Sequence, residues 1–424
     1  MSAAPHSLST KRLLIAILLV AVALRLAWRI HLGNEDFWAN GYSFFYELGV
    51  SLASGNGFVL GDSRAMRVPL YPVFLALMTL AGKYYLWVVV PQSLMGAGTV
   101  WCTYAVARDL FGERSGLLAA TVTALYPYYV VHDTALQETG MFTFLTTAAM
   151  LLLLRAMRGG GWKLWCFAGA VLAMAVLTRQ TLLPFALCAL AWIACFSEGD
   201  RARKWKRAAI VAAPVVIMVG GWVARNYAVV GAPVITSELG FQLWNGNNSK
   251  TFSRYPAESI DRSADEALAS LSQQHRVQLD ALGGNEVAEN DWFLRKAAAY
   301  IRDNPVAALH GAARKLWATF SWRFSPRRES LAEWILLLSY GPVCALGVYG
   351  MWATRERWRE LGLIYLLFLT FAAVTGLFFG HTSHRSYLDL WWVVCGAGMA
   401  SDRLIDTLRG NGHTVSGGSI YESC

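Results

Sequence analysis

The chain alternates long apolar runs with short polar ones. Its first apolar run extends from Leu13 to about Ile30, directly after Lys11 and Arg12. A helix needs about 20 apolar residues to cross a bilayer, and no small-residue cleavage site follows this run, so it predicts a retained transmembrane helix. Nine further runs of similar character lie at about 87–106, 116–132, 139–155, 163–179, 181–196, 208–226, 331–352, 361–380 and 386–404. The pattern therefore predicts an all-α polytopic membrane protein with about ten transmembrane helices.

One further apolar segment, 68–82, is shorter and contains prolines. Whether it crosses decides on which side every later loop lies, and basic residues favour the cytoplasmic side. If it does not cross, the cytoplasmic side receives Lys11, Arg12, Arg108, Arg114, Arg155, Arg158, Lys163, Arg201, Arg203, Lys204, Lys206, Arg207, Arg355, Arg357, Arg359, Arg403 and Arg409. We therefore expect 68–82 to form a helix that lies on or dips into the outer face. Both chain ends are then expected in the cytoplasm, with the chain in the plasma (inner) membrane.

This topology leaves two polar regions outside the membrane, at about 32–86 and 227–330. The mixed aromatic, small and polar residues of 42–53 suit a short interfacial helix within the first region. The second region has helical patterns at 263–281, 291–302 and 306–320. We expect a membrane core at 1–226 that includes the first outer loop, an extracytoplasmic and mostly helical loop domain at 227–330, and C-terminal transmembrane helices with a cytoplasmic tail at 331–424.

Composition agrees with a membrane protein. Hydrophobic residues make up 55% of the 424 residues, charged residues make up 15%, and the mean hydropathy is +0.37. Such a chain cannot fold as one soluble globule with an ordinary polar surface. The formal charge of +9 follows from the basic cytoplasmic loops, so we expect no nucleic-acid partner. The seven cysteines show no CxxC spacing and are interpreted as core thiols rather than metal ligands or disulfides.

Charged residues at the ends of the apolar runs are the candidates for chemistry, because charge beside a bilayer needs a partner and usually marks function. Glu35 and Asp36 directly follow the first run, and Arg179 ends the fifth. A guanidinium can bind a lipid-linked phosphate through two parallel hydrogen bonds. Each residue also has a structural alternative. The acids could be solvated or cap a helix, and the arginine could simply extend to the interface.

Several motifs in chain order resemble the membrane core of the GT-C glycosyltransferases. The similarity is strongest to the dolichyl-phosphate-mannose-protein mannosyltransferases and the bacterial lipid A sugar transferases, and it covers roughly the first 250 residues. The motifs are Arg67–Leu77, Gln92, Ala107–Gly112, Tyr126–Pro127, Gln137–Glu138, Leu177–Arg179, Trp222–Tyr227, Gly240 and Asn245–Asn248. The resemblance implies an inverting transferase that takes a sugar from a polyprenyl phosphate carrier at the outer face and passes it to a glycan, lipid or protein.

The resemblance also implies roles for particular residues. An acid in the first outer loop is expected to act as general base, and Asp36 matches it best by position. Relatives carry Asp-Glu at this place, so Glu35 stays a candidate, and Glu47 stays one because some members have a glutamate there. Arg179 is expected to bind the carrier phosphate, and Glu138 is the second acid of the family. Glu138 either acts on the substrate or caps the fourth span.

Five further residues are expected in the substrate site. These are Arg225, at the end of the seventh span, His384 and Arg385, between the last two spans, and Arg67 and Tyr71 from the first motif. A divalent metal is an open alternative, because Asp133 and Glu138 could converge outside the membrane and His381 lies three residues before His384.

Two functions of other classes compete with the transferase. A transporter or flippase for lipid-linked sugars would also place charges at helix ends. Such proteins usually show two similar halves and helices broken at the midplane, neither of which this sequence has. A non-catalytic subunit of an envelope assembly would explain the many spans but would give Asp36 and Arg179 no role.

Overall fold

The computed structural model describes residues 8–38, 42–80 and 82–410. Its elements are α1 (Leu8–Leu32), α2 (Ser43–Ala53), α3 (Leu70–Thr79), α4 (Tyr85–Phe111), α5 (Glu113–Leu125), α6 (Pro127–His132), α7 (Thr139–Met157), α8 (Trp162–Thr178), η1 (Gln180–Leu182), α9 (Leu183–Phe196), α10 (Arg201–Val230), α11 (Leu239–Gly246), α12 (Ile260–Ala269), α13 (Gln273–Asp280), α14 (Glu286–Asp303), α15 (Pro305–Phe320), α16 (Ser330–Ala353), η2 (Arg355–Arg357), α17 (Trp358–Leu377) and α18 (Thr382–Gly410). Within these ranges no β-strand forms, as the sequence predicts.

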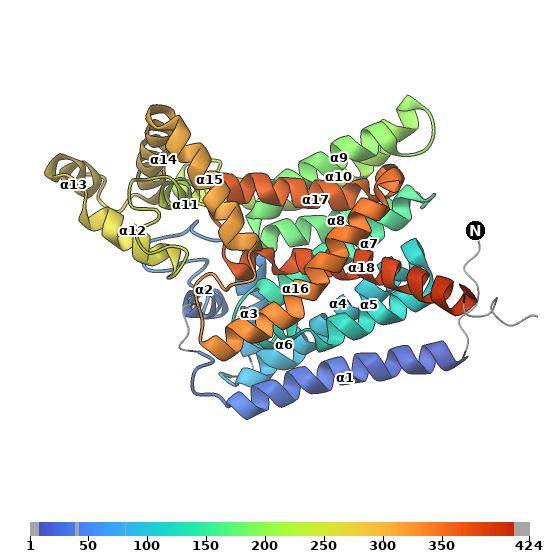
Figure 1. Ribbon diagram of the computed structural model, residues 1–424. Helices are drawn as coiled ribbons and strands as arrows, with labels where there is room; N and C mark the ends of the chain where they lie inside the picture. Colours follow the sequence, from blue (N-terminus) through green and yellow to red (C-terminus); the bar gives the residue numbers. More distant parts are fainter. Residues whose placement is uncertain (1–7, 39–41, 81, 411–424) are drawn as a thin grey trace, which may run out of the picture.

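The long helices pack side by side in one bundle (Figure 1). Five of them are long and apolar enough to cross a membrane by length and composition: Ser9–Leu32, Thr139–Met157, Arg201–Val230, Ser330–Ala353 and Arg355–Leu377. The described chain is therefore a multi-pass membrane protein. The apolar helices Trp162–Thr178 and Gln180–Phe196 are shorter. The number of ten spans stays a prediction.

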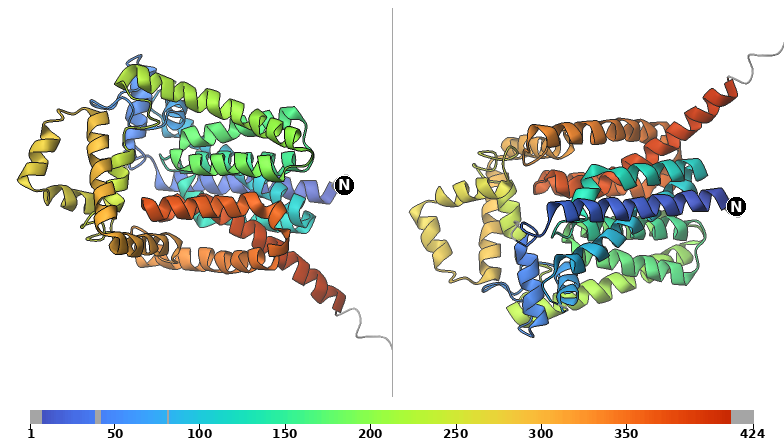
Figure 2. Two further views of the ribbon diagram at one scale, coloured as in Figure 1. Left: turned by 90° about the horizontal axis from the view of Figure 1, so that it is seen from above. Right: turned by 90° about the horizontal axis from the view of Figure 1, so that it is seen from below.

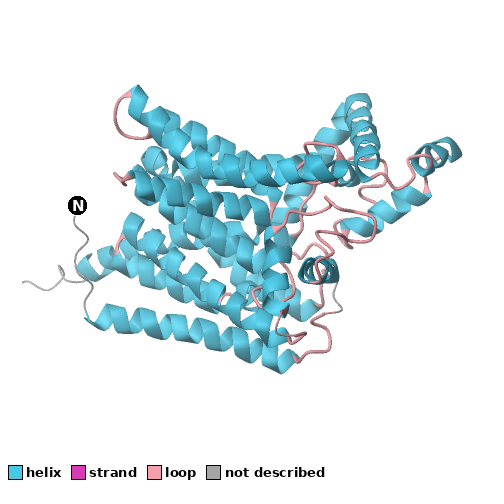
Figure 3. Ribbon diagram, turned by 180° about the vertical axis from the view of Figure 1, so that it is seen from behind, coloured by secondary structure: helices cyan, strands magenta, loops and turns pink. Residues whose placement is uncertain are grey.

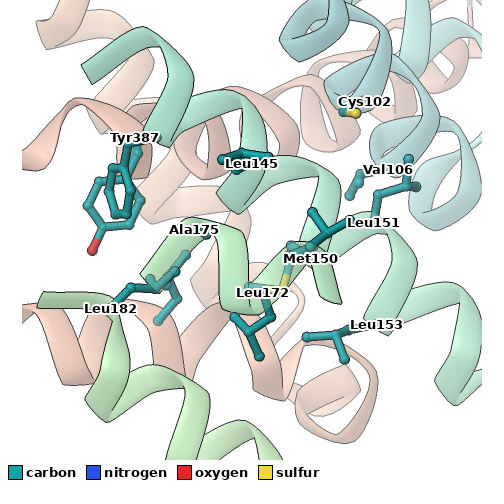
Figure 4. Close-up of a cluster of buried hydrophobic side chains, with 14 of the residues drawn as sticks. Cys102, Val106, Leu145, Met150, Leu151, Leu153, Leu172, Ala175, Leu182 and Tyr387 are labelled. Carbon is teal, nitrogen blue, oxygen red and sulfur yellow. The ribbon is translucent and has the colours of Figure 1, made fainter. Parts of the chain in front are cut away.

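The core of the bundle lies around α7. In its apolar window 72% of residues are buried, against 17% for α16, so α7 is central while α16 presents most of its surface outward. α7 packs against α4 and α8, and α8 packs against α10. Figure 4 shows how side chains from α4, α7, α8 and α18, such as Val106, Met150, Leu172 and Tyr387, fill the space between these helices.

The two polar regions meet at one end of the bundle, which we call the insertion end. Helices α2 and α3 lie there together with α11–α15, while α1 begins and α18 finishes at the opposite end (Figures 1 and 2). The loops between these elements also gather at the insertion end (Figure 3). Ten residues of helix span about 15 Å, so α3 alone is too short to cross a bilayer. This agrees with the expected helix at 68–82.

Two predicted helices are divided in the structure. The run 116–132 is not one helix, because Pro127 has no amide hydrogen and Tyr126 before it is extended, so α5 ends at Leu125 and α6 starts anew. The pattern at 263–281 also forms two helices. Ser272 accepts a hydrogen bond from the His275 amide and so caps the start of α13.

Two glycines seat α11 in the structure. A Cβ atom at Gly240 would lie 1.9 Å from the carbonyl oxygen of Asn290 in α14, and one at Gly246 would lie 1.8 Å from that of Phe378 after α17. Any side chain at these positions would collide with backbone, so α11 can approach α14 and the bundle this closely only with glycine. The 227–330 region is thereby joined to the end of α17.

Candidate active site

An arginine–carboxylate pair lies at the insertion end, where α7 begins and α8 ends. Arg179 follows Thr178, and its extended backbone takes the chain out of α8. Its guanidinium donates to Oε1 of Glu138 through Nε, at 3.1 Å, and through Nη2, which also reaches Thr139 Oγ1 at 3.2 Å. The guanidinium carbon of Arg179 lies over the Phe142 ring, 4.8 Å from the ring centroid. The order of residues at the helix ends thus brings together two of the predicted site residues.

This pair leaves two polar atoms unused. One carboxylate oxygen, Oε1, accepts both hydrogen bonds from Arg179, so Oε2 of Glu138 and Nη1 of Arg179 are buried without a hydrogen bond among the described residues. Leaving a buried polar atom unpaired costs about 1–3 kcal/mol. A ligand with an oxyanion could take the free Nη1 hydrogens and relieve this cost.

Tyr42 brings the loop after α1 to the same place. Burial raises the pKa of its hydroxyl, the Glu138 carboxylate raises that pKa further, and the Arg179 guanidinium opposes both. Both charges therefore act on Tyr42, whose side chain keeps 36% of its surface exposed. Sequence reasoning placed Tyr42 only in an interfacial helix and did not connect it with Arg179.

The start of α18 covers another side of this region. The rings of His381 and His384 lie 5.4 Å apart, and Phe379 packs against both. Burial lowers the pKa of His381 to about 4, although the Asp261 carboxylate acts in the opposite direction. His381 is therefore neutral near pH 7. Asp261 belongs to α12, so the 227–330 region contributes a carboxylate close to these histidines.

Arg67 and Tyr71, from the first motif, have different surroundings. Arg67 forms an ion pair with Glu238 and lies over the Phe44 ring at 4.7 Å. Burial raises the pKa of Glu238, while Arg67 opposes that rise. Tyr71 is buried and donates a hydrogen bond of 2.8 Å to Gln92 Oε1.

Gln92 connects Tyr71 to the segment that carries Glu138. Its amide nitrogen donates to the carbonyl oxygens of Asp133 and Ala135, at 3.0 and 2.9 Å. The Asp133 carboxylate accepts a hydrogen bond of 2.8 Å from Arg25 of α1, and both side chains are buried. Gln92, Arg25 and Tyr71 therefore hold the loop between α6 and α7 that leads to Glu138.

The three candidate bases lie on the exposed surface of the first loop. Glu35 and Asp36 are exposed in the turn after α1, and Glu47 is exposed on α2. Arg29 holds this turn, because its Nε donates to the Gly33 carbonyl at 3.0 Å and its guanidinium lies over the Phe37 ring. Among the described residues no hydrogen bond or ion pair joins these acids to Arg179 or Glu138. Their catalytic role stays a prediction.

Arg385 and Arg225 are engaged with the protein itself. Arg385 is fully buried, pairs with Asp389 at 3.3 Å and donates to the carbonyl oxygens of Thr319 and Ser321. Arg225 donates to the Arg64 carbonyl and lies over the Trp222 ring at 5.0 Å. The structure brings neither of them into contact with the Arg179–Glu138 pair.

The residues of this region do not fit a metal site. Asp133 pairs with Arg25 and Glu138 pairs with Arg179, so an arginine already neutralises each of the two acids. In the described ranges no three His, Cys, Asp or Glu side chains come together as metal ligands would. We therefore derive no step through a metal.

Two important pairs were missed in the sequence, although each had a signal. Arg25 lies in the middle of the first apolar run, where a charge requires a buried partner, and Asp133 is that partner. Asp389 follows Arg385 by four residues, which places both on one face of a helix. The signal at Arg25 did not show which acid would pair with it, because Asp133 lies 108 positions further along the chain.

Comparison with known sequences gives two matches. Residues 66–222 match the family model described as dolichyl-phosphate-mannose-protein mannosyltransferase. YycA of Bacillus subtilis (strain 168), named only provisionally as a mannosyltransferase, is 27% identical over 194 residues. That alignment covers 42% of this chain and 27% of YycA. The family match names the group that the sequence motifs resemble, and the name of YycA agrees with it in the transferred sugar.

Comparison with solved structures gives a likeness over almost the whole chain. The Archaeoglobus fulgidus oligosaccharyltransferase tethered to an acceptor peptide aligns with a TM-score of 0.52 and 12% identity, covering 94% of this chain and 50% of that one. The A. fulgidus oligosaccharyltransferase AglB, in complex with an inhibitory peptide and a dolichol-phosphate, aligns with a TM-score of 0.50 and 13% identity over 97% and 53%. The chain thus spans about half the length of these solved proteins, and the likeness shows the fold.

Proposed function

We propose that the chain is a membrane glycosyltransferase of the GT-C class, because residues 66–222 match the mannosyltransferase family model and the fold resembles that of the solved oligosaccharyltransferase. It moves a sugar from a polyprenyl phosphate carrier to an acceptor at the insertion end. The matched family is named for transfer from dolichyl phosphate mannose, and the AglB complex contains a dolichol-phosphate. A lipid-linked phosphosugar is therefore the donor class that we propose here.

The Arg179–Glu138 pair is the observation that carries this proposal. It combines a guanidinium with an unused Nη1 and a carboxylate with an unused Oε2 at the end of the bundle where both polar regions meet. Arg179 lies inside the matched range 66–222. We assign Arg179 to the carrier phosphate, because a guanidinium stabilises the negative charge that grows on a departing phosphate. The Arg179 charge acts on both Tyr42 and His384, and we assign these two residues to the donor headgroup.

The proposed reaction is a single displacement with inversion. The acceptor hydroxyl oxygen forms a bond to the anomeric carbon while the bond from that carbon to the carrier phosphate breaks. The hydroxyl proton passes to Asp36, and polyprenyl phosphate leaves with the bonding electron pair. Asp36 is exposed, so it can be reached by an acceptor from the water phase. Glu35 and Glu47 are the alternative bases.

We propose that the insertion end faces the outside of the cell and that the start of α1 is cytoplasmic. Labelling of single cysteines, in a variant without the seven native ones, tests this orientation. Ser270 in the 227–330 region and Glu198 between α9 and α10 are both exposed and lie at opposite ends of the bundle. An impermeant reagent added outside should label Ser270→Cys and not Glu198→Cys. The reverse labelling would contradict the orientation.

The activity is tested by reconstitution. Purified protein in liposomes receives a polyprenyl phosphate that carries a labelled sugar, together with extracts of envelope glycans, lipids and proteins as acceptors. The transferase reading expects free polyprenyl phosphate and labelled acceptor in equal amounts. Movement of intact labelled lipid across the bilayer without release of polyprenyl phosphate would instead identify a transporter. If neither transfer nor movement is observed, the assembly subunit is the remaining function.

A further inference from the structure

The loop at 321–329, between α15 and α16, forms one wall of a cavity that the proposed reaction does not use. The cavity has a volume of about 280 Å³. Trp317, Trp322, Arg323, Ser325 and Arg327 are among the residues that line it. Its walls therefore combine two indole rings with two guanidinium groups.

The charged side chains that line this cavity, Arg323 and Arg327, are both positive. Its lining among the described residues contains no aspartate or glutamate. None of the hydrogen bonds or ion pairs found in the described ranges involves the guanidinium of Arg323 or Arg327. The carboxylate of Glu333, in the first turn of α16, accepts hydrogen bonds from the backbone amides of Phe324 and Arg328 instead. The cavity is thus suited to an anion that can accept hydrogen bonds from two arginines.

The surroundings place this cavity at the membrane interface. Helix α16 starts directly after the loop and is one of the candidate spans, with most of its surface facing outward. Leu331 and Trp334 in its first turns are 71% and 60% exposed, and Trp317 beside the cavity is 66% exposed. Exposed tryptophans next to an apolar span occupy the level of the lipid headgroups. The arginines of this loop therefore lie where the phosphate groups of lipids lie.

The loop is held in place without a ligand. Ser325 donates its backbone amide to Thr382 Oγ1 at 2.9 Å, and the Thr382 amide donates to the Ser325 carbonyl at 3.0 Å. The Arg327 amide donates to the carbonyl of Ala257 at 2.9 Å. The loop thus contacts both the start of α18 and the 227–330 region. Because it is already ordered, binding a headgroup would cost the protein little conformational freedom.

We propose that this cavity binds the phosphate headgroup of an anionic membrane phospholipid. Arg323 and Arg327 donate hydrogen bonds to the phosphate oxygens, Trp317 and Trp322 contact the glycerol and the first carbons of the chains, and the chains lie along the outward face of α16. The site uses none of the residues assigned to the carrier phosphate, so a membrane lipid and the sugar donor can bind together.

The experiment measures lipid binding to the full chain in neutral detergent by native mass spectrometry. The probes are phosphatidylglycerol, zwitterionic phosphatidylcholine and soluble glycerol phosphate. The wild type should bind phosphatidylglycerol at least tenfold more tightly than either of the others. The Arg323→Gln/Arg327→Gln variant should lose at least tenfold in affinity for phosphatidylglycerol. The Arg323→Lys/Arg327→Lys variant keeps the charge but not the two-pronged hydrogen bonds, and it should lose less.

A matched control removes two positive charges elsewhere. Lys250 and Arg295 are exposed in the 227–330 region and do not line the cavity, so Lys250→Gln/Arg295→Gln should bind phosphatidylglycerol as the wild type does. An equal loss in this control would mean that only net charge matters and would overturn the proposal. So would equal affinity for phosphatidylcholine, or glycerol phosphate binding as tightly as the lipid. If the glutamine variant fails to fold, the lysine variant and the three probes still decide.

Discussion

Two arginine–carboxylate pairs at the insertion end consist of the same groups but differ in what encloses them. The side chains of Arg385 and Asp389 are 0% and 2% exposed, whereas those of Arg179 and Glu138 are 13% and 11% exposed. Arg385 stacks on the Tyr340 ring at 3.5 Å and donates to two backbone carbonyls at the end of α15. Arg179 has the Phe142 ring on one side and the Tyr42 region of the first loop nearby.

The difference separates architecture from chemistry. The enclosed pair joins α18 to the segment after α15, and Tyr126 adds a hydrogen bond of 3.2 Å to Asp389. Breaking a buried pair leaves a charge without a partner, so such groups are needed for the fold. Both pairs contain buried polar atoms without a hydrogen bond among the described residues, but only the Arg179–Glu138 pair is partly exposed to solvent. We infer that enclosed charges stabilise this molecule and that open charges at the same end act on the substrate.

The largest effect is expected for Asp36, an exposed carboxylate that belongs to neither pair. Asp36→Asn should lower the rate of polyprenyl phosphate release by about 100- to 10,000-fold, because an amide cannot accept the hydroxyl proton. Its thermal stability should remain that of the wild type, since Asp36 is on the surface. Initial rates in liposomes measure the effect, with Glu35→Gln and Glu47→Gln as controls. Normal turnover in Asp36→Asn would transfer the role of base to one of those two glutamates.

The enclosed pair should respond in stability instead. Asp389→Ala leaves Arg385 buried without its carboxylate, and such a loss typically costs about 3–5 kcal/mol. Thermal unfolding in detergent should show a large decrease in the midpoint and in the yield of folded protein. Glu138→Ala is the matched change in the open pair, and it should lower the midpoint much less. Similar decreases in both variants would remove the distinction between the pairs.

Much of the helical architecture could be predicted from the sequence, because apolar runs and prolines act locally. The helix break at Pro127 could have been predicted from the sequence, since a residue without an amide hydrogen rarely continues a helix. The Arg179 and Glu138 positions followed from their place at the ends of two spans. Their contact with each other did not, because it depends on how α7 and α8 pack.

The surroundings of the other candidates depended on tertiary packing even more. Arg385 and Arg225 have the same charge and similar positions at helix ends as Arg179, yet backbone carbonyls engage them. Gly246 is a second example of a contact that local patterns cannot predict. It approaches Phe378 closely, although the two residues lie 132 positions apart in the sequence. Sequence patterns thus indicate which residues carry charge at the membrane surface, while the packing decides which of those charges remain accessible.

Variants of Arg179 test whether the partly open pair binds the phosphate of the carrier. Arg179→Ala should weaken binding of polyprenyl phosphate by about 10- to 100-fold, because a charge-assisted hydrogen bond contributes about 1.5–3 kcal/mol. Arg179→Lys keeps the charge without the planar fork and should lie between alanine and the wild type. Arg225→Ala is the control, as Arg225 is engaged with the backbone. Affinity measured with a labelled polyprenyl phosphate tests the order. If Arg225→Ala weakens binding and Arg179→Ala does not, the assignment of the phosphate is wrong.

The smallest effect is expected for Lys315, a fully enclosed charge. Its contribution to the free energy of unfolding should depend on pH. Its Nζ is buried on α15 and donates to oxygens of Gly246, Asn247 and Leu377, with no carboxylate among these acceptors. Burial lowers the pKa of Lys315 from 10.5 to about 8. Below pH 8 the lysine is protonated in both the folded and the unfolded chain, so its contribution to stability is constant there.

Between pH 8 and 10.5 the unfolded chain binds more protons at Lys315 than the folded chain does, so the free energy of unfolding rises with pH in this window. We expect a rise of about 1–2 kcal/mol from pH 8 to 9.5, taking 1.36 kcal/mol for each pKa unit. The measurement is chemical unfolding of wild type and Lys315→Met at both pH values, because their difference cancels the tyrosines and cysteines that titrate in the same range. Lys250→Met, at an exposed lysine, should keep the wild-type slope. A slope in Lys315→Met equal to that of the wild type would show that enclosure by neutral oxygens alone does not make a charge costly in this protein.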